Sequence, residues 1–242
     1  MKTKTVGWFS AGVSSFVAIY LLRNEVDEIF YIDIDNQHPD THRFIKDCEK
    51  VLGKPIQYLK HSKFNSVEEV IEKYRYINGP AGAKCTGELK KKVRQEWEQQ
   101  QSDADVFRYI WGYDFNEKHR AERLLNNNPE YEHLFPLIDK ELSKAEVHGI
   151  LQQLKIKRPV MYDLGYSNNN CIGCVKGGKG YWNKIRKDFP ERFELMARLE
   201  RKIGASCING TYLDELDPDA GRMEKEIMPD CGMLCELSYI EG

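Results

Sequence analysis

The chain has 242 residues, 41% of them hydrophobic, and its 36 lysines and arginines nearly balance 38 aspartates and glutamates. This length suits one sizeable domain, or one domain with an extension. The near-neutral charge gives no global attraction to nucleic acid or to a membrane surface. No apolar run reaches the roughly 20 residues of a membrane-spanning helix. The segment Met1–Lys4 leads into a strand-like stretch without the apolar core of a signal peptide, so we expect a cytoplasmic protein that does not enter membranes.

Strand and helix patterns alternate through the first two-thirds of the chain. Predicted strands cover residues 5–9, 28–34, 55–61 and 106–114, and predicted helices cover residues 14–23, 40–53, 66–77 and 87–101. Asp40 or Thr41 could begin the second helix, and Gly53 could end it. Ser66 followed by Glu69 is a capping-box pattern at the start of the third helix. The alternation predicts an α/β fold with a doubly wound, mostly parallel sheet.

The sequence pattern changes near Ser143. Residues 143–154 look helical, and residues 180–204 form a helical region that is interrupted near Pro190. Between them lies a loop rich in glycine and asparagine that carries a Cys-x-x-Cys pair. We therefore divide the chain into an α/β core, residues 1–142, and a helical, cysteine-bearing C-terminal region, residues 143–242. No linker separates them, and we expect the two to pack as one unit.

The segment FSAGVSS, residues 9–15, joins the first predicted strand to the first predicted helix. Small residues at this junction present backbone N–H groups to an anion at a helix N-terminus. The segment is not a P-loop, because no lysine follows Gly12, and it is not G-x-G-x-x-G. A serine-capped turn without a ligand is the structural alternative. Asp33 at the end of the next strand favours a nucleotide, since α/β folds bind ribose or adenine there.

Further along, several segments occur in a recognisable order. They are FSAGVSS, IDIDNQHPDT, KCTGELKKK, WGYDFNEKHRAERL, FPLID and PVMYDLGYSNNNCIGC. This ordered set resembles the phosphoadenosine phosphosulfate (PAPS) reductase family of PP-loop proteins over residues 6–174, with DCGMLCE in the tail as an extension. The resemblance implies an adenine nucleotide α-hydrolase-like fold. The family loop S-G-G-x-D-S is S-A-G-V-S-S here, so Ala11 replaces a glycine and Ser14 replaces the aspartate. These changes keep phosphate binding and disfavour Mg²⁺-dependent hydrolysis of ATP.

The resemblance also implies which residues hold the nucleotide. The implied nucleotide-binding residues are Ser10, Gly12, Ser14, Ser15, Asp33, Gly112 and Arg123, with Arg120 in a catalytic role. Physically, an arginine on the helix after the strand that ends near Gly112 can bind a tetrahedral dianion through two parallel hydrogen bonds. The alternative is that Arg120 and Arg123 belong, with Glu117, to a solvated helix face with local ion pairs.

Seven cysteines in a reducing compartment are not expected to form structural disulfides and indicate metal, iron–sulfur or redox chemistry. Family members that carry a [4Fe–4S] cluster have two adjacent cysteines and a later Cys-x-x-Cys, whereas Cys85 here is followed by Thr86. The predicted ligands are Cys85, Cys171, Cys174 and Cys235, and the other candidates for the fourth are Cys207 and Cys231. Zinc is the main alternative, and a site without metal is the third. Cys48 is expected to be a buried apolar residue.

Two chemistries are consistent with this resemblance. Cys231 lies in Asp230-Cys231-Gly232, close to the E-C-G motif of sulfonucleotide reductases, and its thiolate would attack the nucleotide sulfur before another thiol releases sulfite. In the second chemistry, ATP adenylates a substrate, and sulfur carried on the cluster or on a cysteine replaces the activated oxygen. The altered cysteine set narrowly favours this ATP route. The implied ligands and partners are an adenine nucleotide, either ATP or a sulfonucleotide, with Mg²⁺ as its counter-ion, and a thiol or sulfur donor.

A nucleic-acid partner is a separate hypothesis. The segment KGGKGYWNKIRK, residues 176–187, places lysines and an arginine beside Tyr181 and Trp182. Basic residues interleaved with aromatic residues suit backbone contacts and base stacking, as in binders or modifiers of tRNA or DNA. The structural alternative is a solvated basic loop that is packed by its own aromatic side chains.

Overall fold

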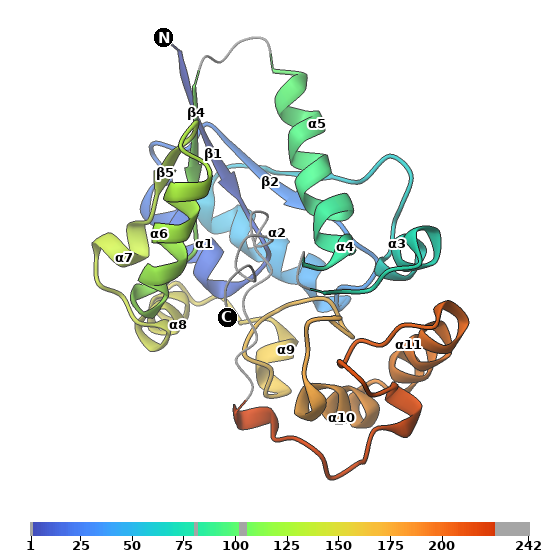
Figure 1. Ribbon diagram of the computed structural model, residues 1–242. Coiled ribbons are helices and arrows are strands. Elements are labelled where there is room, and N and C mark those ends of the chain that lie inside the picture. Colours follow the sequence, from blue (N-terminus) through green and yellow to red (C-terminus); the bar gives the residue numbers. More distant parts are fainter. Residues whose placement is uncertain (1, 80–81, 102–105, 226–242) are drawn as a thin grey trace. The chain divides into compact units, whose positions relative to one another are not determined.

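The computed structural model describes residues 2–79, 82–101 and 106–225 (Figure 1). Contacts divide the chain into two compact units. The first unit comprises Met1–Asp33, His38–Leu59 and Arg94–Asn169, and the second comprises Ile34–Gln37, Lys60–Val93 and Asn170–Gly242. The division of the chain into residues 1–142 and 143–242 stays a prediction. Within the described residues, no helix has both the length and the apolar character needed to cross a bilayer.

The first unit contains a five-stranded parallel sheet. Its strands are β1 (Thr3–Trp8), β2 (Glu28–Ile32), β3 (Ile56–Leu59), β4 (Val106–Ile110) and β5 (Glu132–Leu134), in the order β3-β2-β1-β4-β5. In the register of the sheet, Val6 of β1 lies opposite Glu28 of β2 and Tyr109 of β4. This order confirms the predicted doubly wound α/β sheet, since the chain moves outward from β1 in both directions.

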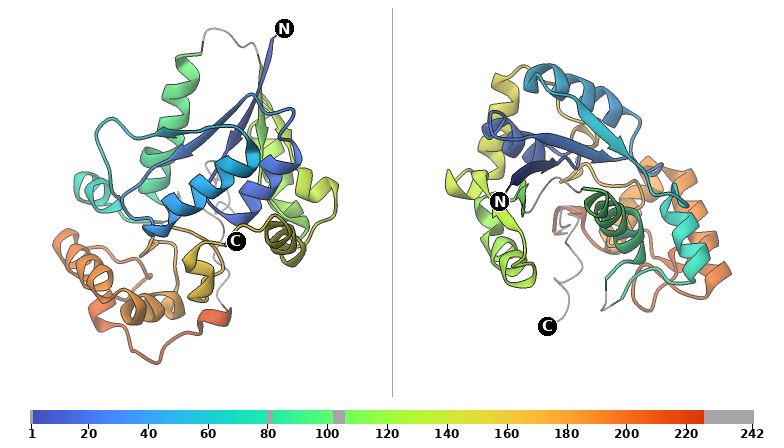
Figure 2. Two further views of the ribbon diagram at one scale, coloured as in Figure 1. Left: turned by 180° about the vertical axis from the view of Figure 1, so that it is seen from behind. Right: turned by 90° about the horizontal axis from the view of Figure 1, so that it is seen from above.

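Helices cover both faces of this sheet. The helices assigned to this unit are α1 (Val13–Leu21), α2 (Asp40–Leu52), α5 (Val93–Gln99), α6 (Lys118–Asn127), α7 (Pro136–Asp139), α8 (Lys144–Gln153) and α9 (Val160–Asp163). Figure 2 shows the sheet and its helices in two further views. One face packs into a core with α1, α2 and α8 through Phe16, Phe44 and Leu151. On the other face, the Trp97 ring of α5 lies 4.7 Å from the Phe30 ring, between centroids. Strand side chains alternate in direction, so Tyr31, next to Phe30, joins the first core.

The second unit is helical. Its elements are α3 (Val67–Tyr74), α4 (Lys84–Thr86), the π-helix η1 (Gly87–Lys92), α10 (Lys179–Asp188), α11 (Pro190–Ile203) and the 3₁₀ turns η3 (Leu213–Glu215) and η4 (Met223–Lys225). The predicted interruption near Pro190 is confirmed, because α10 ends at Asp188 and Pro190 begins α11. Trp182 of α10 is fully buried, and its ring packs 6.3 Å from that of Phe193 of α11.

Several local predictions need correction. Neither Asp40 nor Thr41 caps α2, because Pro39 is the N-cap residue and Asp40 is already helical. The helix predicted from residue 87 begins at Lys84 and passes through a six-residue π-helix. The caps at Gly53, with φ +64°, and at Ser66, whose hydroxyl accepts from the Glu69 N–H at 3.2 Å, are confirmed.

Candidate functional site: a phosphate-type loop and a thiol pocket

The loop between β1 and α1 is held by serine hydroxyls. Ser15 Oγ donates to the carbonyl of Gly12 at 3.0 Å, accepts from the backbone N–H of Ser10 at 3.3 Å, and lies 3.0 Å from Ser10 Oγ. Ser14 and Ser15 are both buried. The predicted residues Ser10, Gly12, Ser14 and Ser15 therefore lie in one tight turn at the N-terminus of α1.

The turn depends on a strained alanine. Ala11 has a left-handed φ of +58° and is fully buried. A Cβ in that region costs roughly 1–2 kcal/mol, which explains why glycine suits this position in the related loop. Gly12, the N-cap residue, is extended and has no side chain with which to cap α1. The positive end of the helix dipole thus has no cap from its own N-cap residue, which suits an anion site.

Two side chains that the sequence did not predict support this loop. The Asn169 amide donates to the carbonyl of Ala11 at 2.9 Å and to Thr41 Oγ1 at 3.2 Å. The Tyr162 hydroxyl accepts from the N–H of Val13 at 3.2 Å. Asn169 lies 158 residues from Ala11 along the chain, so no local sequence signal predicts the contact.

Gly112 lies against the same turn. A Cβ at this position would stand 2.5 Å from Ser15 N and 2.6 Å from Ser15 Cα. Both contacts are with backbone, so no side-chain rotation could relieve them. The end of β4 therefore approaches the first turn of α1 only because residue 112 has no side chain. β1 and β4 are neighbours at the switch point of the sheet, where open α/β folds bind ligands.

Asp33 follows β2 at the same edge of the sheet. Its N–H donates to the carbonyl of Leu59 at 2.9 Å, and Oδ1 lies 3.8 Å from His42 Nε2. The imidazole of His42 stacks on Tyr58, with 5.9 Å between centroids and an interplanar angle of 16°. The end of β2 thus carries a carboxylate beside a flat aromatic pair, which suits contacts to a nucleoside.

The basic residues after β4 lie on α6, as predicted. The Arg120 guanidinium pairs with Glu117 and lies 4.4 Å from the centroid of the Tyr113 ring. Arg123 is exposed. Asp114 and Glu117 form a capping box at the 3₁₀ turn Phe115–Glu117 that precedes α6. The local ion pair that we weighed as the alternative is therefore present, and it fixes the orientation of the Arg120 side chain.

A clamp of hydrogen bonds around Asp40 and Arg43 holds the start of α2. Asp40 accepts two hydrogen bonds from Arg43, at 2.9 and 2.7 Å, and one from the N–H of Val160 at 3.0 Å. Arg43 also donates to the carbonyls of Lys157 and Arg158. The Arg43 hydrogen bonds hold the pKa of Asp40 below its usual range. The clamp ties α2 to the segment that leads into α9.

This clamp predicts an acid-sensitive contribution to stability. A carboxylate with a lowered folded pKa stabilises the protein above its unfolded pKa, and that contribution is lost as the pH falls through the folded value. We expect Asp40→Asn to lower the free energy of unfolding at pH 7 by about 1–2 kcal/mol. The difference from the unmodified protein should shrink below about pH 4. Urea unfolding at several pH values measures it, and a constant difference down to pH 3 would contradict the assignment.

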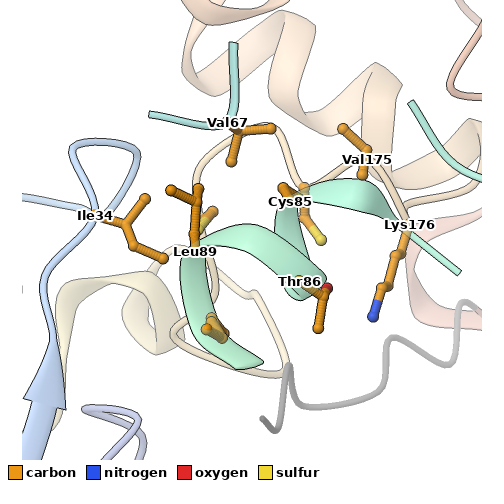
Figure 3. Close-up of a pocket in the computed structure, with 10 residues that line it drawn as sticks. Ile34, Val67, Cys85, Thr86, Leu89, Val175 and Lys176 are labelled. Carbon is orange, nitrogen blue, oxygen red and sulfur yellow. The ribbon is translucent and has the colours of Figure 1, made fainter. Parts of the chain in front are cut away.

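In the second unit, three cysteines line one pocket. Cys85 of α4 and Cys171 and Cys174 of the later loop surround an empty volume of about 380 Å³, part of it open to solvent. Apolar side chains, including those of Val67 and Leu89, form much of the wall beside Cys85 (Figure 3). Lys90 and Lys176 also line the pocket.

The turn that carries Cys171 and Cys174 is built to a fixed shape. The Tyr181 hydroxyl accepts from the N–H of Cys174 at 2.8 Å and donates to the carbonyl of Cys171 at 3.2 Å. Gly173 has a left-handed φ of +76°, which reverses the chain between the two thiols. The predicted metal residues Cys85, Cys171 and Cys174 are therefore brought together.

The remaining cysteines lie in different places. Cys231 and Cys235 lie outside the described residues. Cys48 is fully buried in the core of the first unit, as predicted, and Cys207 is buried in the second. In the part of the chain that the structure describes, no three His, Cys, Asp or Glu side chains form a ready site for a metal ion.

The aromatic residues of the predicted nucleic-acid segment are not at the surface. Tyr181 is 2% exposed and Trp182 is 0% exposed. Arg186 donates to the carbonyls of Leu213 and Leu216, at 3.1 and 2.8 Å. These side chains pack the second unit, so they offer no stacking surface for bases.

Comparisons with known proteins bear on the first three-quarters of the chain. The family model of the phosphoadenosine phosphosulfate reductase domain matches residues 4–179. No curated protein matches the sequence. Among solved structures, the chain is similar to the phosphoadenylyl-sulfate (PAPS) reductase from Candida auris in its phosphate complex. The two chains are 14% identical, the match covers 71% of this chain and 81% of that one, and the TM-score is 0.47. The family match includes the loop at α1 and Cys85, Cys171 and Cys174, and it ends before Cys207.

Proposed function

The chain belongs to the phosphoadenosine phosphosulfate reductase domain family, and we propose that it binds an adenine sulfonucleotide and reduces its sulfonate group to sulfite. The membership confirms the resemblance drawn from the ordered motifs. One observation carries the proposal: the turn Ser10–Ser15 presents the N-terminus of α1, whose N-cap residue Gly12 has no side chain, beside Gly112. In this proposal the phosphosulfate lies at that helix end, where backbone N–H groups and the helix dipole favour negative charge.

The loop favours a phosphosulfate over a triphosphate. A P-loop supplies a lysine to the terminal phosphates, and no lysine follows Gly12 here. Ser14 stands where the related ATP-binding loop has an aspartate, so the carboxylate oxygen that Mg²⁺ prefers is absent from that position. Arg120, held in place by Glu117 and Tyr113, and Arg123 supply positive charge to the sulfonate instead.

Reduction needs a nucleophile and a second thiol. In our proposal the thiolate of Cys231 attacks the sulfonate sulfur, forms an S–S bond and releases the nucleoside phosphate with the bridging oxygen. A second thiolate, from Cys235 or from a thiol donor, then attacks the sulfur of Cys231 and releases sulfite. Two thiols are oxidised to a disulfide as the sulfur gains two electrons, so the step balances. A reducing compartment such as the cytoplasm would maintain both thiols.

We propose an iron–sulfur cluster as the occupant of the thiol pocket. Cys85, Cys171 and Cys174 provide soft thiolate ligands in one apolar pocket with two lysines at its wall. When bound, such a cluster would supply charge and redox character to the thiol pocket. Zinc is the competing occupant, because four thiolates also form a structural zinc site.

ATP-dependent adenylation coupled to sulfur transfer is the second candidate. It is favoured by the cysteine set, because Thr86 replaces the second of the two adjacent cysteines of cluster-bearing reductases. A nucleic-acid acceptor for such a reaction has no support from Tyr181 and Trp182, which are buried.

Calorimetric titration of the anaerobically purified protein with PAPS, adenosine 5′-phosphosulfate and ATP tests the proposal. We expect a sulfonucleotide to bind at least about tenfold more tightly than ATP, a difference of about 1.4 kcal/mol. Ser14→Ala and Asp33→Ala should weaken that binding, while Ser66→Ala, a helix cap in the second unit, should not. Tighter binding of ATP, with pyrophosphate release, would favour the second candidate.

A further inference from the structure

Ala11 holds a strained backbone conformation in the interior of the first unit. Among the described residues other than glycine, a positive φ occurs at Ala11, Arg75, Glu141 and Lys155. The last three are exposed, whereas Ala11 is fully buried in the turn before α1. A residue in this conformation persists only where the surrounding contacts hold it, so the partners of Ala11 show what fixes the turn.

The side chain of Asn169 forms an amide bridge between Ala11 and α2. Its nitrogen donates to the carbonyl of Ala11 at 2.9 Å and to Thr41 Oγ1 at 3.2 Å. Asn169 is 5% exposed and Thr41 is 1% exposed, so both hydrogen bonds are shielded from water. Because Thr41 lies in the first turn of α2, the bridge fastens the strained residue to a helix rather than to another loop.

The oxygen of the same amide shows that packing alone does not account for an asparagine at this position. Asn169 Oδ1 is buried and, within the described residues, has no hydrogen-bond partner. A buried acceptor without a partner lowers stability, and an apolar side chain of similar size would avoid that cost. The two hydrogen bonds that the Asn169 nitrogen donates therefore account for the residue type.

The segment that carries Asn169 is itself held in place. The clamp at the start of α2 binds the N–H of Val160, the first residue of α9. Tyr162 of α9 accepts from the N–H of Val13, the first residue of α1, at 3.2 Å. The chain before Asn169 is thus attached to both helices that the amide bridge joins, which fixes the position of the amide.

We propose that Asn169 is a positioning residue for nucleotide binding, and that its amide bridge offsets the strain of an alanine at position 11. The inference rests on the proposed function, because it concerns the same turn before α1. Without the bridge, Ala11 can relax to a negative φ, and the neighbouring peptide groups rotate. The N–H groups of the turn then no longer converge on the phosphosulfate. Glycine at position 11 carries no such strain, so it makes the bridge dispensable.

A double-mutant cycle of Ala11→Gly and Asn169→Ala, measured by calorimetry with PAPS and with ATP, tests the proposal. The strain of an alanine with positive φ corresponds to about tenfold in an equilibrium constant. We therefore expect Asn169→Ala to weaken PAPS binding about tenfold beside alanine and less than about threefold beside glycine. Equal weakening in both backgrounds, or no weakening in either, would overturn the proposal.

Asn128→Ala is the matched control for Asn169→Ala. Asn128 is also buried in the first unit, and its amide also donates to a backbone carbonyl, that of Leu124, at 3.2 Å. Its replacement should lower the urea midpoint and leave PAPS affinity unchanged. A purely structural role of Asn169 would give this same result for Asn169→Ala. Loss of affinity with unchanged circular dichroism, restored by Ala11→Gly, is the result expected of a positioning residue.

Thr41→Val provides a milder variant should Asn169→Ala fail to fold. It removes only the α2 end of the amide bridge, so PAPS binding should weaken by about threefold and recover with Ala11→Gly. An unchanged affinity would overturn the proposal. If the unmodified protein binds ATP and not PAPS, the proposed reductase function is wrong, and the same cycle with ATP decides the role of Asn169. If it binds neither nucleotide, both are wrong.

Discussion

Replacing Gly112 by alanine is expected to weaken nucleotide binding at least about tenfold, or 1.4 kcal/mol. The added Cβ would stand 2.5 Å from Ser15 N, so the first turn of α1 must move away from β4. The N–H groups that we assign to the phosphosulfate would move with it. Overpacking of this kind also costs about 1–3 kcal/mol of stability. Gly112 is not among the residues with positive φ, so the effect is steric rather than conformational.

Gly149→Ala is the matched control for this variant. Gly149 lies within α8, and a Cβ there has no atom within 4 Å. Alanine should stabilise that helix by about 0.5–1 kcal/mol and leave nucleotide affinity unchanged. Calorimetry and urea unfolding of both variants give the comparison. An unchanged nucleotide affinity in Gly112→Ala would contradict the assignment of the turn Ser10–Ser15 to the binding site.

The second large effect is expected at Glu200. Glu200→Ala leaves two buried N–H groups, those of Cys207 and Leu213, without their acceptor. Each buried, unsatisfied donor costs about 1–3 kcal/mol, so we expect the free energy of unfolding to fall by about 2–5 kcal/mol. Burial raises the pKa of Glu200, and the hydrogen bonds from the N–H groups of Cys207 and Leu213 offset part of that rise. Chemical denaturation followed by circular dichroism measures the loss.

Glu200→Gln tests the cause. Glutamine keeps one carbonyl oxygen as an acceptor but turns an NH₂ group toward the other donor. Its cost should therefore lie between those of the unmodified protein and the alanine variant. Equal losses in the two variants would show that packing around Glu200, rather than the two hydrogen bonds, decides stability.

The sheet and its phosphate-type loop could be predicted because their signals are local. Val6 to Phe9 and Ile29 to Ile32 are apolar runs, and a small-residue turn before an apolar helix occupies a few neighbouring positions. The strand β5, only three residues long, has too few residues for such a pattern and was not predicted. The π-helix at Gly87–Lys92 was missed because its residues are ordinary helix formers.

The features that could not be predicted from the sequence depend on tertiary contacts. The contacts of Asn169 with Ala11 and Thr41 span more than 120 residues, and no spacing rule reports them. Tyr181 and Trp182 matched a nucleic-acid pattern by composition, yet their burial depends on α11, which follows later. Sequence order shows which residue types are present, and packing decides which of them reach solvent.

The two units alternate along the chain in six segments, so neither can be completed from one continuous piece. The core of the first unit includes Val147 and Leu151 of α8, and its last segment ends at Asn169. During synthesis, the apolar face of α1 would therefore stay uncovered until more than half of the polypeptide has been made. We expect amino-terminal fragments to aggregate, and yields from the ribosome to depend on chaperones that shield such intermediates.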